Sequence, residues 1–403
     1  MSTLSSTFAF PGVQWRVENV YYRQLTTKVG SGVTPRGGEA VYKTEGHPFV
    51  RSQNVGLGNL LLDDIAFIDE ETHLRQKNTE LQFNDVLLNI TGASIGRSAL
   101  VDKQIVGGNV NQHVCIIRTK ENLVPSFICS FLLSNYGQRQ IDSFQAGGNR
   151  QGLNFEQIKS IKITIPSKDE QIKIAKLLRA IDERIATQNK IIEKLQSLIK
   201  GLNDHILKNI EGDQVCFADL GEAYGGLSGK SGDDFGCGDP FITYMNVYQN
   251  TYISENDYEL VQIAPDEKQN SVQYGDALFT LSSETPEEVG MGAVYLGKSQ
   301  KLYLNSFCFG VHFHGNRVLP QYIAHFISST SFRKAIYPLA QGSTRFNLQK
   351  QDFMRMKFVL PSLEEQKRIA TALDALYNHL ANEKLLTEQY LLLKQYLLQQ
   401  MFI

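Results

Sequence analysis

One helix start occurs twice in this chain: the segment PSKDEQIKIAKLL recurs 195 residues later as PSLEEQKRIATAL. In the first copy Ser167 is placed to cap the helix while Glu170 reaches back to the same turn, and Ser362 and Glu365 repeat this arrangement. A proline precedes both capping boxes, and a periodic apolar stretch follows both. The pattern predicts two long helices, one in the middle of the chain and one in its last fifty residues.

Both predicted helices carry a heptad seam, in which core positions alternate in steps of four and three. In the first helix the seam consists of Ile174, Leu178, Ile181, Ile185, Gln188, Ile192, Leu195, Ile199, Leu202 and Ile206. In the second it consists of Ile369, Leu373, Leu376 and Leu380, and then, one residue out of step, of Leu386, Tyr390, Leu393 and Leu397. Such a slip would overwind a coiled coil locally. A helix of about 40 residues is roughly 60 Å long, too long for its own domain to cover, so we expect the two seams to pack on each other.

The helix starts belong to a longer internal repeat. VPSFICSFLL matches LPQYIAHFIS and AGGNRQGLNF matches QGSTRFNLQK at the same offset, whereas HPFVRSQNV matches DPFITYMNV at an offset of 192. The chain is therefore a tandem duplication of a globular domain followed by a long helix. The predicted boundaries are 1–165 and 211–360 for the two domains, and 166–210 and 361–403 for the two helices.

Chain connectivity predicts the direction of the helices. The second domain begins where the first helix ends and stops where the second helix begins, and the two ends of a domain commonly lie close together. The helices should then run antiparallel, with an approximate twofold axis between the halves. Inside the domains we expect strands at HVCIIR, DVLLNI, IKITI and FCFGVHF, and one short helix over PSFICSFLLSNYGQRQI. The predicted fold class is α+β: two similar α/β domains separated by a long antiparallel two-helix coiled coil.

Composition narrows the functional class. The chain has neither a run of eighteen apolar residues nor the pattern of a secretory signal, so a cytoplasmic location is expected. Its five cysteines form no CxxC pair and are expected to be reduced, mostly buried thiols. The net charge is −2, and residues 211–360 carry 17 acidic and 11 basic side chains. Any binding to nucleic acid must therefore depend on local basic clusters or on a partner.

The sequence contains no convincing catalytic or metal-binding motif. In GGLSGKS the residue five before Gly229 is Tyr224, so the spacing of a phosphate-binding loop fails by one position. His312 and His314 share one face of a predicted strand, but a third metal ligand is not apparent. We therefore expect no catalytic site, metal or cofactor in this chain.

The chain resembles a known family, the specificity subunits of type I restriction-modification enzymes. The resemblance rests on the twin PS..EQ..IA..L helix starts, the GDxLF-like turns at Asp85 and Asp276, and the elements around Arg150 and Arg345, and it covers essentially the whole chain. It implies that two target-recognition domains each read one half of a bipartite double-stranded DNA sequence. It also implies that the long helices set the unread spacer and dock two methyltransferase subunits, and that restriction (motor-nuclease) subunits join the complex. S-adenosylmethionine, ATP and Mg²⁺ would then belong to the partner subunits.

The internal repeat sorts the candidate DNA contacts. Residues that are identical at matched positions are candidates for the shared fold or for phosphate contacts, and differing residues in the same loops are candidates for reading bases. Arg150 and Arg345 are predicted phosphate contacts, with a loop-to-helix bridge inside the fold as the alternative. Arg51 and Gln53 are predicted base readers, because arginine and glutamine make bidentate contacts to guanine and adenine. Further candidates of the same kind are Tyr244, which faces them in the second copy, and Arg97, Asn111, Gln112 and Lys230.

Two alternatives remain open at this point. Asn54 and Asn246, at the ends of matched strands, are expected to anchor a turn rather than to touch DNA. The rival function is a non-enzymatic coiled-coil adaptor whose duplicated domains bind protein or carbohydrate, which the acidic balance of residues 211–360 favours.

Overall fold

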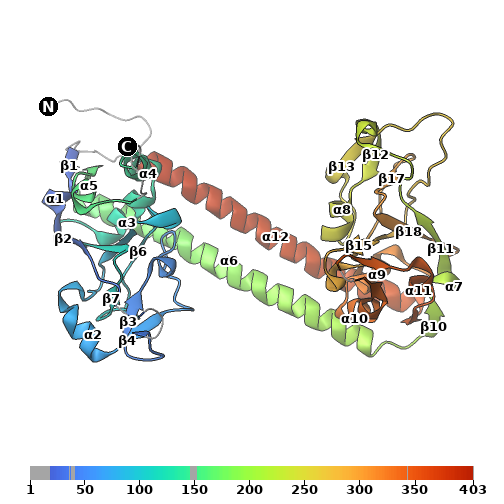
Figure 1. The fold of residues 1–403 in the computed structure, drawn as a ribbon, viewed down its shortest axis with the longest axis horizontal. Coiled ribbons are helices and arrows are strands. Elements are labelled where there is room, and N and C mark those ends of the chain that lie inside the picture. The colour runs from blue at the N-terminus through green and yellow to red at the C-terminus, as the bar shows by residue number, and fades with distance from the viewer. Residues whose placement is uncertain (1–18, 36, 38–40, 146–151, 343, 403) are drawn as a thin grey trace. The chain divides into compact units, whose positions relative to one another are not determined.

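The computed structural model describes residues 19–35, 37, 41–145, 152–342 and 344–402 (Figure 1). The chain divides into two compact units. Unit 1 comprises Met1–Asn189 and Leu385–Ile403, and unit 2 comprises Lys190–Lys384. Each unit therefore contains one globular portion together with a stretch of each long helix.

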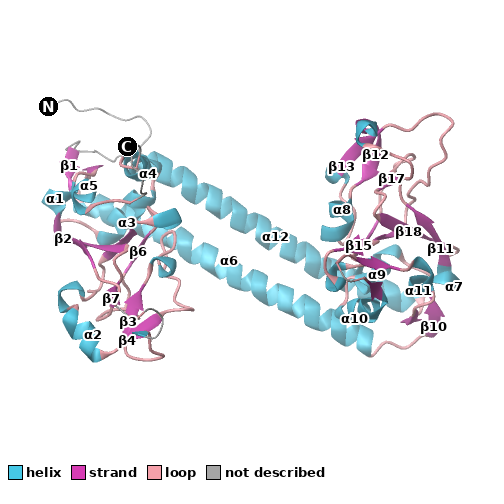
Figure 2. Ribbon diagram, viewed as in Figure 1, coloured by secondary structure: helices cyan, strands magenta, loops and turns pink. Residues whose placement is uncertain are grey.

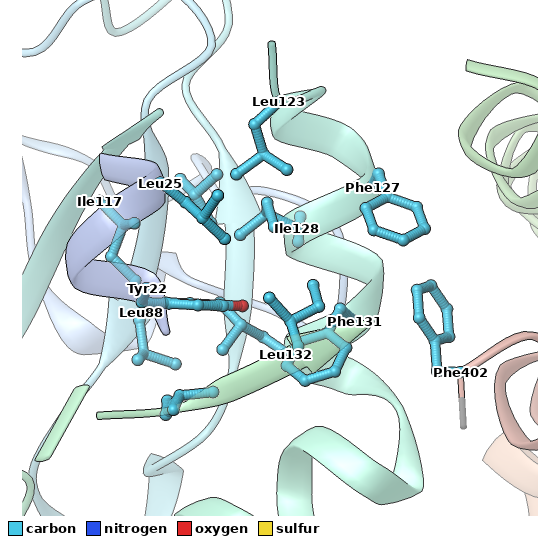
Figure 3. Packing of buried hydrophobic residues seen from close by; sticks show 14 of the residues in the cluster. Tyr22, Leu25, Leu88, Ile117, Leu123, Phe127, Ile128, Phe131, Leu132 and Phe402 are labelled. Atoms are coloured by element: carbon cyan, nitrogen blue, oxygen red, sulfur yellow. The ribbon is translucent and has the colours of Figure 1, made fainter. Parts of the chain in front are cut away.

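The two long helices are α6 (Lys168–Lys208) and α12 (Leu363–Met401), drawn as the longest coils in Figure 2. In unit 1, Leu178 near the start of α6 belongs to the same core as Phe402, which follows the end of α12. Figure 3 shows Phe402 facing Phe127 and Phe131 of helix α3 (Pro125–Leu133); its ring centroid lies 5.2 Å from that of Phe127 and 5.9 Å from that of Phe131. In unit 2, Leu202 near the end of α6 packs on the core that contains Leu373 near the start of α12. Within each unit the start of one helix thus accompanies the end of the other, which confirms that they are antiparallel.

Most predicted seam positions are covered. Ile174, Leu178, Ile181, Ile369, Leu373 and Leu380 are buried, and Ile185, Ile192, Leu195 and Leu376 are half-buried. The predicted slip in the second helix is wrong, because Leu393 is 43% exposed while Thr387 is buried. The heptad spacing instead continues unbroken from Leu380 to Thr387 and then to Lys394, each seven residues after the last. The ammonium of Lys394 lies 2.6 Å from the carboxylate of Asp182, which also belongs to unit 1. Because this polar pair occupies the seam, a prediction from apolar residues alone placed the seam at the wrong positions.

The capping boxes are only half formed. Ser167 Oγ accepts the backbone N–H of Glu170, and Ser362 Oγ accepts that of Glu365, both at 3.3 Å. The two glutamate carboxylates instead bind basic side chains one turn along the helix, Lys173 at 3.0 Å and Arg368 at 2.5 Å. The predicted serine caps are confirmed. The predicted bonds from the glutamate side chains back to the serines are wrong, because a nearby cation offers each carboxylate a charged partner.

The sheets of the two units have the same topology. In unit 1 the order β2-β8-β5-β6 is antiparallel throughout, and the second sheet has the order β4-β3-β7, with β3 and β7 parallel. A third ladder joins β1 to β9. The strands are β1 (Asn19–Tyr21), β2 (Thr26–Ser31), β3 (His47–Val50), β4 (Ala66–Ile68), β5 (Val86–Asn89), β6 (Ser98–Leu100), β7 (Asn109–Val110), β8 (Val114–Thr119) and β9 (Lys162–Thr164).

Unit 2 repeats these sheets as β11-β18-β14-β16, β13-β12-β17 and β10-β21, and it also contains the small sheet β15-β20-β19, whose matched segment in unit 1 includes residues outside the described part. The register is also repeated, since Val86 pairs with Ile117 in unit 1 and Ala277 with Val311 in unit 2. The strands are β10 (Asp213–Cys216), β11 (Gly221–Gly225), β12 (Phe235–Ile242), β13 (Tyr258–Val261), β14 (Ala277–Thr280), β15 (Ser282–Ser283), β16 (Gly292–Val294), β17 (Tyr303–Leu304), β18 (Cys308–Phe313), β19 (Ala340–Gln341), β20 (Phe346–Leu348) and β21 (Lys357–Leu360). The four strands expected from the sequence are confirmed.

The single short helix expected over PSFICSFLLSNYGQRQI is wrong, because two helices occur there. α3 (Pro125–Leu133) ends at Ser134, whose extended backbone breaks the run and whose hydroxyl caps α4 (Asn135–Ser143) by accepting from Gly137 N at 3.1 Å. α9 (Pro320–Ile327) and α10 (Thr330–Ile336) repeat this break at Ser329. The remaining helices are α1 (Tyr22–Leu25), α2 (Glu70–Arg75), α5 (Phe155–Lys159), α7 (Phe217–Leu220), α8 (Tyr244–Gln249) and α11 (Lys350–Met354).

All five cysteines are free thiols, and three of them are buried. Among the residues that the structure describes, no helix is both long enough and apolar enough to cross a membrane.

Candidate nucleic-acid interface

In unit 1 three loops meet where strands β3, β5 and β7 end. Asn89 Nδ2 at the end of β5 donates to Ser52 O after β3 at 2.8 Å, and Ile90 N donates to His113 O before β8 at 3.0 Å. These bonds join the first loop to the second and the second to the third. We call the three loops loop face 1; they are residues 51–54, 89–97 and 111–113.

Unit 2 brings the matched loops together in the same way. Leu281 N donates to Phe307 O at 2.7 Å, and Tyr244 OH donates to Ser282 O at 2.9 Å. Strand β20 pairs with β15 and brings the segment that follows Arg345 to the same edge. We call this assembly loop face 2; it consists of residues 243–246, 281–291, 305–307 and 341–346, among which residue 343 lies outside the described part.

Arg51 and Gln53 share one partner, Asp64. Arg51 Nη2 donates to the backbone oxygen of Asp64 at 2.6 Å, and Gln53 Nε2 donates to its carboxylate. The guanidinium of Arg51 also lies over the ring of Tyr42, 5.3 Å from its centroid, and the side chain is 23% exposed. These contacts hold both predicted base readers in place at loop face 1. Asn54 is buried beside them and binds Asp64 and Leu61 O, so it anchors the turn as expected; Asn246 does the same in unit 2.

Asn111 and Arg97 also lie on loop face 1 but differ in exposure. Asn111 is 7% exposed, and its Oδ1 accepts the N–H of His113 at 3.0 Å. Asn305 accepts the N–H of Phe307 in the same way at 2.9 Å. Asn111 and Asn305, which are identical at matched positions, therefore stabilise the loop. The Arg97 side chain, by contrast, is exposed. Arg150 falls outside the described residues.

Lys230 does not present a free ammonium group. Its side chain is 8% exposed, and its Nζ binds the carboxylate of Glu267 and the backbone oxygen of Gln262 at 2.6 Å. The hydrogen bond from Lys230, together with one from Gln269, lowers the pKa of Glu267 to about 2. This ion pair ties the turn after β11 to the segment after β13.

Arg345 and Tyr244 line one pocket of about 350 Å³ on loop face 2. Met245, Phe307, Ser283 and Glu288 contribute to the same pocket. The Arg345 guanidinium lies over the exposed ring of Phe307, 5.7 Å from its centroid. The structure thus brings together two residues that the sequence predicted separately.

A carboxylate at the edge of this pocket is already engaged by its neighbours. Glu288 accepts from Tyr248 OH at 2.7 Å and from Ser283 Oγ at 3.0 Å. These bonds lower the pKa of Glu288, and the bond to Glu288 raises the pKa of Tyr248. At neutral pH the carboxylate is therefore ionised and acts only as a hydrogen-bond acceptor.

Sequence reasoning missed the residues that hold the second loop of each face. In unit 1, Gln138 Nε2 donates to Gly96 O at 3.1 Å. At the matched position in unit 2, Arg333 donates to the backbone oxygens of Glu287, Val289 and Gly290 at 2.6 to 2.7 Å. The loop of unit 2 carries about three extra residues, and the longer side chain with more donors secures it. The available signal was that the two residues share the 195-residue offset.

The aspartates of the GDxLF-like turns are bound inside each unit. Asp85 forms two bonds of 2.7 Å with the guanidinium of Arg118, and Asp276 binds Tyr224 OH at 2.6 Å and His312 Nδ1. Burial raises the pKa of Asp276, which its hydrogen bonds oppose. His312 is thus a partner of a buried carboxylate, and the described residues hold no group of three or more side chains suited to a metal ion.

Similarity to known proteins decides the family. A family model described as the type I restriction modification DNA specificity domain matches residues 29–197 and 230–389, which is most of the chain. The chain belongs to this family. It is a DNA sequence specificity subunit of a type I restriction-modification system, its role is DNA recognition, and the adaptor alternative has no support.

Relatives and solved structures agree with this family. The specificity subunit of the type I restriction enzyme EcoKI from Escherichia coli (strain K12) is 23% identical over 382 residues, 86% of this chain and 79% of that protein. A putative type I specificity subunit, MjaX, from Methanocaldococcus jannaschii is 22% identical over 360 residues, 82% of this chain and 80% of that protein. The crystal structure of the S subunit from M. genitalium matches 98% of this chain and 97% of its own with a TM-score of 0.57 at 13% identity. A chain from a structural study of complex assembly and conformational transition of the type I R-M system matches 97% of this chain and 98% of its own, with a TM-score of 0.60 at 15% identity. Both solved structures therefore share the fold of this chain.

Proposed function

We propose that unit 1 and unit 2 each read one half of a bipartite DNA target, unit 1 through loop face 1 and unit 2 through loop face 2. One observation carries this proposal: the two faces share a hydrogen-bonded framework and differ in the side chains displayed on it. Asn111 and Asn305 hold the same turn, yet the turn presents His113 in unit 1 and Phe307 in unit 2. A duplicated framework with different side chains is what two different half-sites require, because base contacts specify sequence.

Within each face the roles differ by exposure and partners. Arg345 and Arg97, both exposed, are proposed phosphate or base contacts, and Arg150 is proposed by its match to Arg345. Arg51 and Gln53 are proposed base readers that Asp64 orients. Asn111 and Lys230 are proposed to shape the loops rather than to contact DNA, because their side chains are almost fully buried and are bound to partners inside the unit.

The chemistry of restriction and modification is proposed to come from other subunits. The domains 1–165 and 211–360 would then recognise DNA, and the helices 166–210 and 361–403 would set the spacer and dock two methyltransferase subunits. Restriction subunits would complete the complex in the cytoplasm. S-adenosylmethionine, ATP and Mg²⁺ are assigned to those partners, and this chain is proposed to contain no catalytic site.

Selection from a randomised DNA library tests the proposal. The chain is purified with its cognate methyltransferase subunit, and bound DNA is enriched and sequenced. The expected result is a sequence in two parts with a fixed gap between them. Enrichment of one contiguous sequence, or of no sequence at all, rules the proposal out.

A further inference from the structure

The third loops of the two faces have the same backbone and different side chains. His113 N donates to Asn111 Oδ1 at 3.0 Å, and Phe307 N donates to Asn305 Oδ1 at 2.9 Å. Their carbonyl oxygens accept from the second loop, from Ile90 N at 3.0 Å and from Leu281 N at 2.7 Å. The backbone N–H and the backbone carbonyl of both residues are thus held by the same kind of hydrogen bond, so His113 and Phe307 occupy equivalent places.

The surroundings of the two side chains differ in polarity. His113 Nδ1 lies 2.6 Å from Thr91 Oγ1, and its Nε2 lies 3.3 Å from Gln112 Nε2, so the ring belongs to a polar cluster. Phe307 is 53% exposed and lines the pocket on loop face 2 with Met245, which is 48% exposed. The polar cluster around His113 on face 1 is thus replaced on face 2 by a small apolar surface, formed by Phe307 and Met245 within a pocket that polar residues otherwise line.

This apolar surface is not part of a core. Phe307 and Met245 lie outside the hydrophobic clusters formed by the described residues of unit 2. Burying either side chain elsewhere in the unit would favour folding, yet the framework of Asn305 and Leu281 holds Phe307 at the surface. The position is therefore suited to contact with an apolar group of a ligand.

We propose that Phe307, together with Met245, is a specificity-determining residue that reads the methyl group of a thymine in the half-site bound by unit 2. This inference rests on the proposed function. Thymine is the base whose major-groove edge carries a methyl group, and phenylalanine contacts such methyl groups directly. A polar base edge placed directly against Phe307 and Met245 would lose hydrogen bonds to water that these two side chains cannot replace.

Charged groups around the pocket fit the same ligand. The guanidinium of Arg345, stacked on the Phe307 ring, supplies the positive charge that a neighbouring phosphate needs. The ionised carboxylate of Glu288 accepts hydrogen bonds, and Glu284 lines the same pocket. In an A·T pair the adenine amino group, which is a donor, lies on the same major-groove edge as the thymine methyl, with thymine O4 between them. Both features of the pair therefore find a matching group on loop face 2.

The test removes the methyl group alone. Once selection has defined the target, each thymine is replaced in turn by deoxyuridine, and affinity is measured for the complex of the full chain with its methyltransferase subunit. For the natural chain, one replacement should weaken binding about fourfold, the effect of one buried methyl-sized group. Phe307→Ala should bind the thymine and deoxyuridine targets equally, whereas Phe307→Leu should retain part of the discrimination. Tyr274→Ala, which removes an exposed aromatic ring outside this pocket, should leave the discrimination unchanged.

The outcomes separate the two proposals. If no deoxyuridine replacement affects binding, or if Phe307→Ala keeps the full discrimination, the thymine reading is wrong while the bipartite recognition stands. If selection yields no two-part target, the proposed function itself fails. If Phe307→Ala is folded but no longer binds the half-site of unit 2, its normal binding to the half-site of unit 1 will show this. The discrimination between thymine and deoxyuridine is then measured with Phe307→Leu, and the inference is wrong if that variant discriminates as fully as the natural chain.

Discussion

Gln171 and Gln366 make the same junction in the two units. Gln171 Oε1 accepts from Val124 N at 2.8 Å, and its Nε2 donates to Pro166 O at 3.1 Å. Gln366 accepts from Leu319 N at 2.8 Å and donates to Pro361 O at 2.8 Å and to Arg317 O at 2.9 Å. Both side chains are almost fully buried. The repeated glutamine thus ties the start of each long helix to the start of a short helix in the same unit.

Replacing Gln366 with alanine should destabilise unit 2. The change leaves the Leu319 N–H and two carbonyl groups without their partner in a buried place, which costs about 1–3 kcal/mol. The free energy of unfolding, measured by urea denaturation, should fall by that amount. Gln389→Ala, an exposed position on α12, is the matched control and should change it by less than about 0.5 kcal/mol. Equal effects of the two substitutions would show that the junction carries no special stability.

Arg333→Gln should loosen the second loop of loop face 2. Three charged hydrogen bonds to carbonyl groups hold residues 287–290, and glutamine cannot replace all three. Hydrogen bonds to charged groups contribute about 1.5–3 kcal/mol, so the amide of Gly290 should exchange its hydrogen at least tenfold faster. Lys334→Gln, an exposed neighbour, should leave the exchange rate unchanged. Unchanged exchange in Arg333→Gln would mean that the loop is held by its other contacts.

Unit 2 should lose stability as the pH falls below about 6.5. Burial lowers the pKa of His325 below its ordinary value, although Asp374, 2.8 Å from its Nε2, opposes the shift. Its Nδ1 is buried and has no partner among the described residues, so a second proton there would be unpaired. Unfolded His325 binds a proton near pH 6.5 and the folded side chain does so only at lower pH, so protons favour the unfolded state in between.

The pH effect is measured by urea denaturation at pH 7.5 and 5.5. The other groups that face His325 are Tyr252 and Tyr377, which are neutral in this pH range, and Asn203. The side-chain amide of Asn203 donates to the backbone oxygen of His325. The contribution of His325 is at most about 1.4 kcal/mol per pH unit. His325→Gln should reduce the difference in stability between the two pH values. A difference as large in the variant as in the natural chain would assign it to other groups.

Inserting one heptad at matching places in α6 and α12 tests the spacer role of the helices. Seven helical residues add about 10.5 Å, or roughly three base pairs of DNA at 3.4 Å each. The selected target should keep the letters of both half-sites and gain about three base pairs in its gap. Changed letters with an unchanged gap would contradict this role.

The local parts of the fold were accessible from the sequence. Ser167 and Ser362 cap their helices because a cap depends on residues only three positions away. The turn anchors Asn54 and Asn246 followed from the repeat, since both copies keep them. The break at Ser134 was missed because α3 and α4 follow each other without a proline or glycine at the boundary.

The parts that depend on distant partners were not accessible. Lys394 lies in the seam because Asp182 on the other helix faces it, and no periodicity of apolar residues reveals that pairing. Lys230 looked like a free cation until the fold placed Glu267 beside it. Phe307 passed unnoticed because its importance lies in its exposure, which a strand pattern around it conceals.

The most direct test of the account changes one face and reads both half-sites. The variant Gln53→Ala with His113→Ala alters only side chains of loop face 1 and leaves loop face 2 and both helices intact. DNA selected by this variant, in complex with the methyltransferase subunit, should show relaxed letters in one half-site, with the other half-site and the gap unchanged. Relaxed letters in both halves, or in neither, would contradict the claim that each unit reads its own half of the target.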